Sequence, residues 1–261
     1  MSRPVITLTT DFGQADGYVG TMKGVILGIC PQATLVDISH EILPHAVQEA
    51  AYVLSTAVLY FPPGSIHLVV VDPGVGSERR PIVAQTESAT YVAPDNGVLT
   101  LALAQDPAHL AIHLTQSGYR LSEVSATFHG RDIFAPAAAH LASGAEPQDM
   151  GNMIPIAELV TLPSPQPLSQ DDGPWQAQVL HVDRFGNLVT NMQVSRIKEQ
   201  NQAEDPRLVV DVGGEQIVSL NRTFADTEQG NLVAYVGSSG YLEIAQREGS
   251  AAGRLGVGVD D

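Results

Sequence analysis

Short runs of β-branched and aliphatic residues alternate with longer amphipathic segments through residues 1–162. The apolar runs predict strands at 5–9, 34–38, 66–71, 82–84 with 91–93, and 109–114. Between them, the spacing of apolar positions predicts helices at 18–29, 46–60, 97–104 and 132–141. Strands that alternate with helices are typical of a mostly parallel sheet covered by helices. We therefore expect an α/β domain over residues 1–162.

The composition changes at residues 163–174, where Pro, Ser, Gln and Asp replace the alternating pattern. Such a stretch continues neither a helix nor a strand, so it predicts a linker. Beyond it, short β-rich segments at 176–182, 208–212, 232–236 and 242–245 are separated by Gly and Asn. This pattern predicts a small antiparallel barrel or sandwich as a second domain over residues 175–261.

Composition and charge restrict the class of protein. The 261 residues are 44% hydrophobic and 16% charged, which is typical of a folded chain. The formal net charge of −16 argues against a nucleic-acid partner, because phosphate binding needs a basic face. No apolar run reaches the roughly 18 residues of a membrane helix, and the start of the chain lacks a signal-peptide pattern. Because Cys30 is the only cysteine, we expect no intramolecular disulfide and a cytoplasmic location. The lack of a long apolar run predicts no membrane partner.

The segment VVVDPGVGSERR, residues 69–80, carries the strongest chemical signal. An apolar run ends there in Asp72, and Arg79 follows after a Pro-Gly turn. Open α/β sheets bind ligands at the carboxyl ends of their strands, so Asp72 is a candidate site residue. A buried carboxylate needs a partner, which Arg79 can supply. The alternative is that Asp72 only opens the turn.

Two further candidates follow apolar segments of the first domain. Asp11 ends a predicted strand and can accept hydrogen bonds from the vicinal hydroxyls of a ribose, or it can serve as a turn or helix-cap residue. His129 lies in the sequence FHGRD and is the best candidate base among the eight histidines, although a lone His is more often structural. We expect Asp132 to cap the following helix and Arg131 to clamp the loop.

The second domain holds two polar clusters. Asp183 and Asn187 flank a Gly turn and can hold an ammonium and a carboxyl or amide group, or can simply form a hairpin turn. Phe224 offers an aromatic face for a planar base, and Ser238 offers a hydroxyl beside a Gly turn. The segments GxGxxG, Walker A, HExxH, CxxC and GxSxG are all missing, which argues against the common nucleotide, zinc and serine-hydrolase sites.

Taken in order, the motifs TTDFG, VDPGVG with its following Arg, APDNG, FHGRDIFAP, DRFGN and SSGYLEIA resemble the S-adenosyl-L-methionine (SAM) hydroxide adenosyltransferases, the adenosine-forming SAM hydrolases. These are relatives of the bacterial fluorinase and chlorinase. The resemblance covers nearly the whole chain. It implies an N-terminal α/β domain, a C-terminal β-barrel and a homotrimer with active sites between neighbouring subunits. It also implies that SAM, as the substrate, is split by water into adenosine and L-methionine without metal or cofactor.

The resemblance also implies roles for single residues of the first domain. Asp72, Arg79 and His129 match the set that activates water, with His129 or Asp72 as the proton acceptor. Asp11 matches the acid that holds the ribose hydroxyls. In the halogenating relatives a Tyr replaces Asp72 and a Tyr-Ser pair replaces His129, so this chain is expected to be a hydrolase. His45 stands where the halogenases have a Trp.

In the second domain, Asp183 and Asn187 match groups at the methionine end and the adenine side of the ligand. Phe224 matches the ring that packs on adenine, and Ser238 matches a contact to the methionine carboxylate. Ser239 departs from the halogenases, which have an Arg after the serine. The sequence leaves two other functions open: a halide-dependent SAM transferase and a non-catalytic protein that binds SAM or adenosine.

Overall fold

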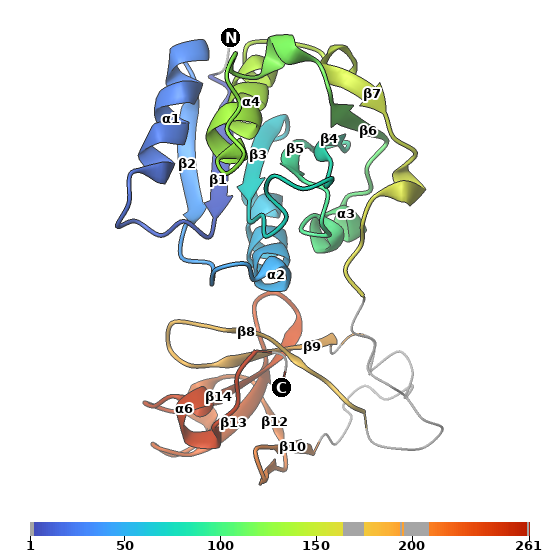
Figure 1. Ribbon diagram of the computed structural model, residues 1–261. Coiled ribbons are helices and arrows are strands. Elements are labelled where there is room, and N and C mark those ends of the chain that lie inside the picture. The colour runs from blue at the N-terminus through green and yellow to red at the C-terminus, as the bar shows by residue number, and fades with distance from the viewer. Residues whose placement is uncertain (1–2, 164–174, 194, 196–208, 260) are drawn as a thin grey trace. The chain divides into compact units, whose positions relative to one another are not determined.

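The computed structural model describes residues 3–163, 175–193, 195, 209–259 and 261 of the chain (Figure 1). The chain divides into two compact units, Met1–Leu162 and Pro163–Asp261, and each has a hydrophobic core of its own. Residues 164–174 of the expected linker lie outside the described residues. None of the helices in the described ranges is long and apolar enough to cross a membrane.

The first unit is built on a seven-stranded sheet with the order β2-β1-β3-β5-β4-β6-β7. Its strands are β1 (Val5–Thr10), β2 (Thr34–Ser39), β3 (Ser65–Val70), β4 (Pro81–Gln85), β5 (Ala89–Pro94), β6 (Leu110–Leu114) and β7 (Gly151–Met153). The pairs β1–β2, β1–β3 and β3–β5 are parallel, whereas β4–β5, β4–β6 and β6–β7 are antiparallel. The expectation of a mostly parallel sheet is therefore wrong: the sheet is mixed, because residues 86–88 connect β4 to β5 too tightly for a parallel crossover.

Four α-helices of this unit cover the sheet, and they lie where the sequence predicts them: α1 (Tyr18–Ile29), α2 (Val47–Ala57), α3 (Thr100–Gln105) and α4 (Ala135–Ala142). Side chains of α1 and α4 pack with one face of the sheet, and side chains of α2 and α3 pack with the other face. All residues of β3 are buried, as expected for a strand covered on both faces. Short 3₁₀ turns lie at Val58–Tyr60, Ser117–Tyr119, Pro147–Met150 and Ile156–Glu158.

The parallel register of β1 and β3 places the first two candidate carboxylates at one edge of the sheet. Thr10, the last residue of β1, pairs with Val70, the last residue of β3. Asp11 directly follows β1, and Asp72 comes two residues after the end of β3. The edge at the carboxyl ends of parallel strands is where open α/β sheets bind their ligands.

The second unit has a five-stranded sheet with the order β12-β13-β14-β9-β8 and a separate β10–β11 pair. The bounds are β8 (Val179–Val182), β9 (Leu188–Gln193), β10 (Val210–Val212), β11 (Glu215–Ile217), β12 (Leu220–Asn221), β13 (Leu232–Val236) and β14 (Tyr241–Gln246), followed by α6 (Ala251–Leu255). All pairs are antiparallel except β12–β13. The described strands form no closed barrel, so the β-barrel stays a prediction.

Candidate functional site

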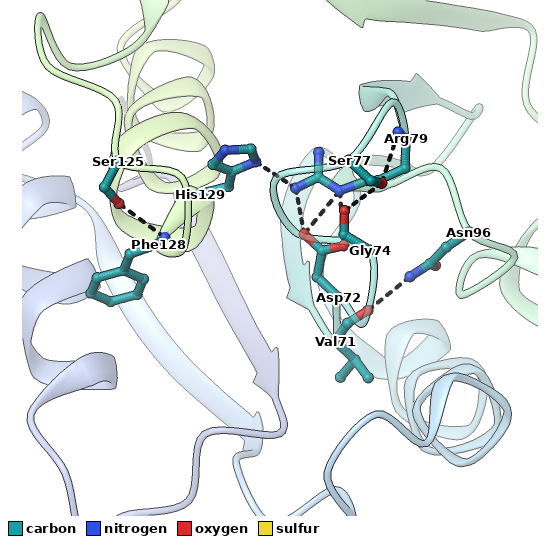
Figure 2. Close-up of polar contacts among 9 residues, drawn as sticks. All are labelled: Val71, Asp72, Gly74, Ser77, Arg79, Asn96, Ser125, Phe128 and His129. Carbon is teal, nitrogen blue, oxygen red and sulfur yellow. Dashed lines mark hydrogen bonds and ion pairs between the residues drawn. The ribbon is translucent and has the colours of Figure 1, made fainter.

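Asp72 and Arg79 form a buried ion pair at the carboxyl end of β3 (Figure 2). Arg79 Nε donates to Asp72 Oδ1 and Oδ2 at 2.8 and 2.9 Å, and Arg79 Nη2 also contacts Oδ2. Only 8% of the Arg79 side chain and 5% of the Asp72 side chain are exposed. Just before the pair, the Asn96 amide donates to the Val71 carbonyl at 2.9 Å and closes the end of the strand. Asp72 is thus more than a turn residue, because a forked guanidinium fixes the orientation of its carboxylate.

The imidazole of His129, which comes from a separate loop, contacts the same guanidinium (Figure 2). Its Nδ1 atom lies 2.7 Å from Arg79 Nη2. A guanidinium only donates hydrogen bonds, so Nδ1 accepts and the ring proton is on Nε2. Burial lowers the pKa of His129, and the Arg79 charge lowers it further, against the opposite effect of Asp72 and Asp132. His129 is therefore a neutral imidazole whose Nε2–H is a hydrogen-bond donor.

Gly76 explains how two loops far apart in the sequence come together. Its φ is +76°, a left-handed conformation that favours glycine. A Cβ at this position would lie 2.6 Å from the Ala126 carbonyl oxygen. Only glycine therefore lets the loop of Asp72 and Arg79 approach the loop that carries His129. The Ser77 hydroxyl tightens the first loop by donating to the Gly74 carbonyl at 2.7 Å (Figure 2).

The loop that carries His129 is held by Asp132, which is fully buried. Its carboxylate accepts hydrogen bonds from the Ser125 backbone N–H at 2.8 Å and from Arg131 Nε at 2.5 Å. Burial raises the pKa of Asp132, but these hydrogen bonds lower it by more. Arg131 contacts only its neighbour Asp132 in this network, so its role as a loop clamp stays a prediction. The expectation that Asp132 caps a helix is wrong, because it lies inside a π-helical turn, Gly130–Phe134, and bonds back to the preceding loop.

A cavity of about 270 Å³ opens beside these groups. Asp11, Asp72 and His129 all line it. Arg79 is not among the lining residues, which means that its charge acts from behind Asp72 and His129. The remaining wall is mostly apolar and aromatic, and it is formed by Phe12, Tyr18, Pro44, His45, Val70, Val75, Thr127, Phe128 and Gly130. Largely apolar cavities with a few convergent polar groups are typical of small-molecule sites.

Three aromatic rings of this wall escaped the sequence analysis. Phe12, Tyr18 and Phe128 contact one another with ring centroids 5.2 to 5.9 Å apart. Their signal in the sequence is position, since Phe12 directly follows Asp11 and Phe128 directly precedes His129. An aromatic residue next to a candidate polar residue is typical of a ligand site, because a planar ligand packs well against its ring.

Asp11 is half-buried, and its carboxylate is oriented by a distant part of the chain. Its Oδ2 atom accepts a hydrogen bond from the His45 backbone N–H at 2.9 Å. His45 itself has a φ of 69°, which is uncommon for a residue other than glycine. The structure thus gives His45 a backbone contact to Asp11, in addition to its place in the cavity wall. Strained backbone of this kind is concentrated at functional sites.

In the second unit, Asp183 and Asn187 hold the turn between β8 and β9. Asp183 Oδ1 accepts from the backbone N–H groups of Phe185 and Asn187 at 2.8 and 2.9 Å, and Asn187 Nδ2 donates to Asp183 Oδ2 at 2.8 Å. The hairpin-turn interpretation is therefore confirmed for this pair. Gly186 completes the turn with a φ of +79°, at a point where a Cβ would collide with Ser250.

Phe224 and Ser238 are exposed in the same unit, and Tyr235 links Phe224 to Glu243. The Phe224 ring packs on Tyr235 with centroids 5.1 Å apart, and the Tyr235 hydroxyl donates to Glu243 Oε2 at 2.7 Å. Burial raises the pKa of Glu243 and the nearby charge of Asp183 adds to this, while the bond from Tyr235 opposes it. Sequence analysis missed Glu243, although an acid inside the apolar strand YLEIA is a visible signal.

The candidate residues therefore fall into two groups, one in each unit. Asp11, Asp72, Arg79 and His129 come together in the first unit. The other candidates, Asp183, Asn187, Phe224 and Ser238, belong to the second. Within the described residues, no group of three or more His, Cys, Asp or Glu side chains is arranged to hold a metal ion.

Comparison with known proteins gives consistent matches along the chain. The model of the SAM hydroxide adenosyltransferase N-terminal domain matches residues 6–151, and that of the C-terminal domain matches residues 177–261. A structure of an uncharacterized conserved protein from Thermotoga maritima superposes with a TM-score of 0.89 at 36% identity, covering 98% of this chain and 97% of that one. The family models and the superposed structure therefore match this chain over both units.

Curated relatives include a protein of Thermus thermophilus named (R)-S-adenosyl-L-methionine hydrolase, which is 42% identical over 98% of this chain and 96% of its own length. A protein of Methanocaldococcus jannaschii with the same name is 35% identical over 97% of this chain and 92% of its own length. A fluorinase of an Actinoplanes species is 27% identical, over 93% of this chain and 91% of its length. The chain belongs to the SAM hydroxide adenosyltransferase family.

Proposed function

We propose that this protein hydrolyses SAM to adenosine and L-methionine through attack of water on C5′ of the ribose. The observation that carries this proposal is the contact of Asp72, Arg79 and His129 beside a cavity that Asp11 also lines. The names of the curated relatives support the same reaction and point to the (R) form of SAM at the sulfonium as a substrate.

The chemistry places most of the catalytic demand on the nucleophile. Attack at C5′ breaks the C5′–S bond, and its electron pair converts the sulfonium into the neutral thioether of methionine. The water oxygen becomes the 5′-hydroxyl of adenosine, and one proton is released. The leaving group needs no acid, so the protein has to exclude bulk water, aim one water molecule and accept its proton.

The tautomer of His129 decides which residue accepts that proton. With Nδ1 engaged by Arg79, the remaining ring nitrogen carries a proton and can only donate. His129 therefore holds the water oxygen through Nε2–H, and the carboxylate of Asp72 accepts a hydrogen bond from the water. Attack by neutral water produces a protonated 5′-alcohol, which is acidic enough to pass its proton to Asp72 and leave the 5′-hydroxyl of adenosine. Arg79 fixes the carboxylate for both steps.

The same arrangement favours water over a halide. A carboxylate accepts a hydrogen bond from water, whereas it repels an anion that approaches C5′. Asp72 is only 5% exposed, so little solvent screens that repulsion. This is the physical basis for preferring hydrolysis to halide-dependent transfer of the adenosyl group.

For the remaining candidates, we propose the roles that the family resemblance implies. Asp11 holds the ribose hydroxyls, Phe224 packs on adenine and Asn187 contacts its edge, while Asp183 and Ser238 hold the ammonium and carboxylate of the methionine part. Because these residues are divided between the two units, we propose a homotrimer in which neighbouring subunits complete each site. The lone Cys30 supports a cytoplasmic location.

Incubation of the purified protein with each sulfonium epimer of SAM, followed by chromatography, tests the proposal. Hydrolysis yields adenosine and L-methionine in equal amounts, and we expect this result for the (R) form. In the presence of chloride, 5′-chloro-5′-deoxyadenosine would instead identify a halide-dependent transferase. Recovery of intact SAM bound to the protein would identify a binding protein and would refute the enzymatic assignment.

A further inference from the structure

Behind Asp11, a chain of polar side chains runs from helix α1 to the end of strand β1. Lys23 Nζ, on α1, lies 2.6 Å from Asp37 Oδ2 on β2. Asp37 Oδ1 lies 3.0 Å from His40 Nε2, and His40 Nδ1 lies 2.9 Å from the hydroxyl of Thr10. We infer that His40, with Asp37 and Lys23 behind it, is a positioning residue that fixes Asp11 for the ribose hydroxyls. This inference rests on the proposed function.

The direction of each contact follows from donor and acceptor chemistry. A carboxylate only accepts, so the Nε2 atom of His40 beside Asp37 carries a proton. That contact is close but poorly aligned, so it is an electrostatic interaction and not a well-formed hydrogen bond. Nδ1 of His40 then accepts from the Thr10 hydroxyl, whose oxygen accepts from the Phe12 backbone N–H at 3.3 Å.

His40 holds the turn that carries Asp11 at both of its ends. Its side chain fixes Thr10, the residue before Asp11. Its backbone carbonyl accepts a hydrogen bond from the Gly13 N–H at 2.7 Å, two residues after Asp11. These two anchors fix the backbone of the turn, so the Asp11 carboxylate stays where the His45 backbone N–H can bind it at 2.9 Å. Preorganised groups of this kind lose less entropy when they bind a ligand.

A β-bulge in β2 lies beside Asp37 and contributes to the placement of these polar contacts. Leu8 pairs with Asp37, but the next residue of β1, Thr9, pairs with Ser39, so β2 has one extra residue there. Bulges redirect side chains and are common beside active sites. Thr10, Lys23, Asp37 and His40 do not line the cavity, which means that they act on the ligand only through Asp11.

A matched pair on the same strand shows what a purely structural His–Thr contact looks like. Thr7 and His67 are buried, and the His67 Nδ1 atom lies 2.8 Å from the Thr7 hydroxyl. The His67 ring packs between Phe61 and Tyr91, and burial lowers its pKa to about 4. Only the His40 contact continues to a charged pair on one side and to the turn of Asp11 on the other.

The test compares His40→Gln with His67→Gln, using SAM and its 2′-deoxy analogue. In the wild type, loss of the 2′-hydroxyl should lower kcat/KM on the order of 10- to 100-fold, because it removes a hydrogen bond to the charged Asp11. In His40→Gln the ratio of kcat/KM between SAM and the 2′-deoxy analogue should shrink towards the small value of Asp11→Ala, because the turn loses its anchor at Thr10 and the carboxylate shifts away from the ribose hydroxyls. In His67→Gln the ratio should stay at the wild-type value.

Lys23→Met extends the test, because Lys23 is partly exposed and its replacement leaves the folded core intact. We expect the ratio to shrink in the same direction, by less than in His40→Gln. A wild-type ratio in both variants, whatever their total activity, would overturn the inference and leave His40 a structural residue. If the wild type fails to cleave SAM, the proposed function fails first, before any comparison between variants.

Discussion

Arg79 donates a hydrogen bond to Nδ1 of His129 at 2.7 Å, and this contact fixes the ring proton on Nε2. The same guanidinium holds both carboxylate oxygens of Asp72. One cation therefore sets the orientation of a hydrogen-bond acceptor, Asp72, and a hydrogen-bond donor, His129, on the cavity wall. In the proposed mechanism, a water molecule between them accepts a hydrogen bond from His129 and donates one to Asp72, and its remaining lone pair attacks C5′.

Two substitutions of His129 distinguish a donor from a base. The side chain of His129→Gln keeps an N–H donor and an oxygen that can accept from Arg79, whereas it cannot take up a proton. We expect His129→Gln to retain most of kcat and His129→Ala to lose much more. Steady-state kinetics with SAM measures both. If His129 is the general base, both variants should lose about 10²- to 10⁴-fold, and equal losses of this size would contradict the donor role.

The pH dependence of kcat/KM reports the protonation of His129. Burial and the Arg79 charge lower its pKa below the ordinary value of about 6.5. Because the neutral ring is the form that accepts from Arg79, activity should hold as the pH falls to 6.5 and decline only at lower pH. Arg79→Met removes the cation and leaves Asp72 and Asp132, which raise the pKa of His129. As the pH falls, the residual activity of this variant should therefore begin to decline at a higher pH than that of the wild type. A wild-type decline centred above pH 6.5 would contradict this assignment.

Arg79 and Arg80 form a matched pair for testing the guanidinium. Arg80 also pairs with a buried strand-end acid, Asp95, at 2.8 Å through Nε, but this pair lies outside the cavity of Asp72 and His129. Arg79→Lys keeps the charge and loses the fork that holds both partners, so kcat should fall about 10²- to 10³-fold. Arg80→Lys should leave kcat nearly unchanged. Comparable losses of kcat in the two variants would show that the Arg79 contacts have no special role.

Gly76→Ala tests whether the approach of the two loops is needed. The left-handed φ alone costs an alanine roughly 1–2 kcal/mol, and the added Cβ also meets the Ala126 carbonyl at 2.6 Å. Gly64→Ala is the control, since Gly64 has a φ of +82° with no atom within 4 Å of a Cβ. Gly76→Ala should lower both the free energy of unfolding, measured in denaturant, and kcat by more than Gly64→Ala does. Equal free energies of unfolding and an unchanged kcat would refute the loop contact.

Much of the first unit could be predicted, because its signals are local. Buried strands and amphipathic helices have different apolar periods, and a strand that ends in Asp72 is visible in the sequence alone. The mixed character of the sheet is not visible in the apolar pattern, because this pattern locates strands but does not give their relative direction. Asp132 was assigned to a helix cap from its position before α4, whereas a π-helical turn directs it to the preceding loop.

The site itself depends on contacts between residues far apart in the chain, which no local pattern reveals. Arg79 and His129 are separated by 50 positions, and the tautomer of His129 follows only from their distance. Glu243 has a local signal, as an acid inside an apolar strand, but its contact with Tyr235 on the neighbouring strand is not visible in the sequence. In the second unit, the turn of Asp183 and Asn187 has the local signature that the sequence predicts.

A single-turnover reaction in ¹⁸O-labelled water, with protein in excess over (R)-SAM, tests the attack of water on C5′ most directly. The mechanism predicts adenosine with one ¹⁸O atom in its 5′-hydroxyl and methionine without label, as measured by mass spectrometry. Unlabelled adenosine, accompanied by ¹⁸O in the carboxylate of Asp72, would show that Asp72 itself had attacked the carbon. That result would contradict the activation of water by Asp72, Arg79 and His129.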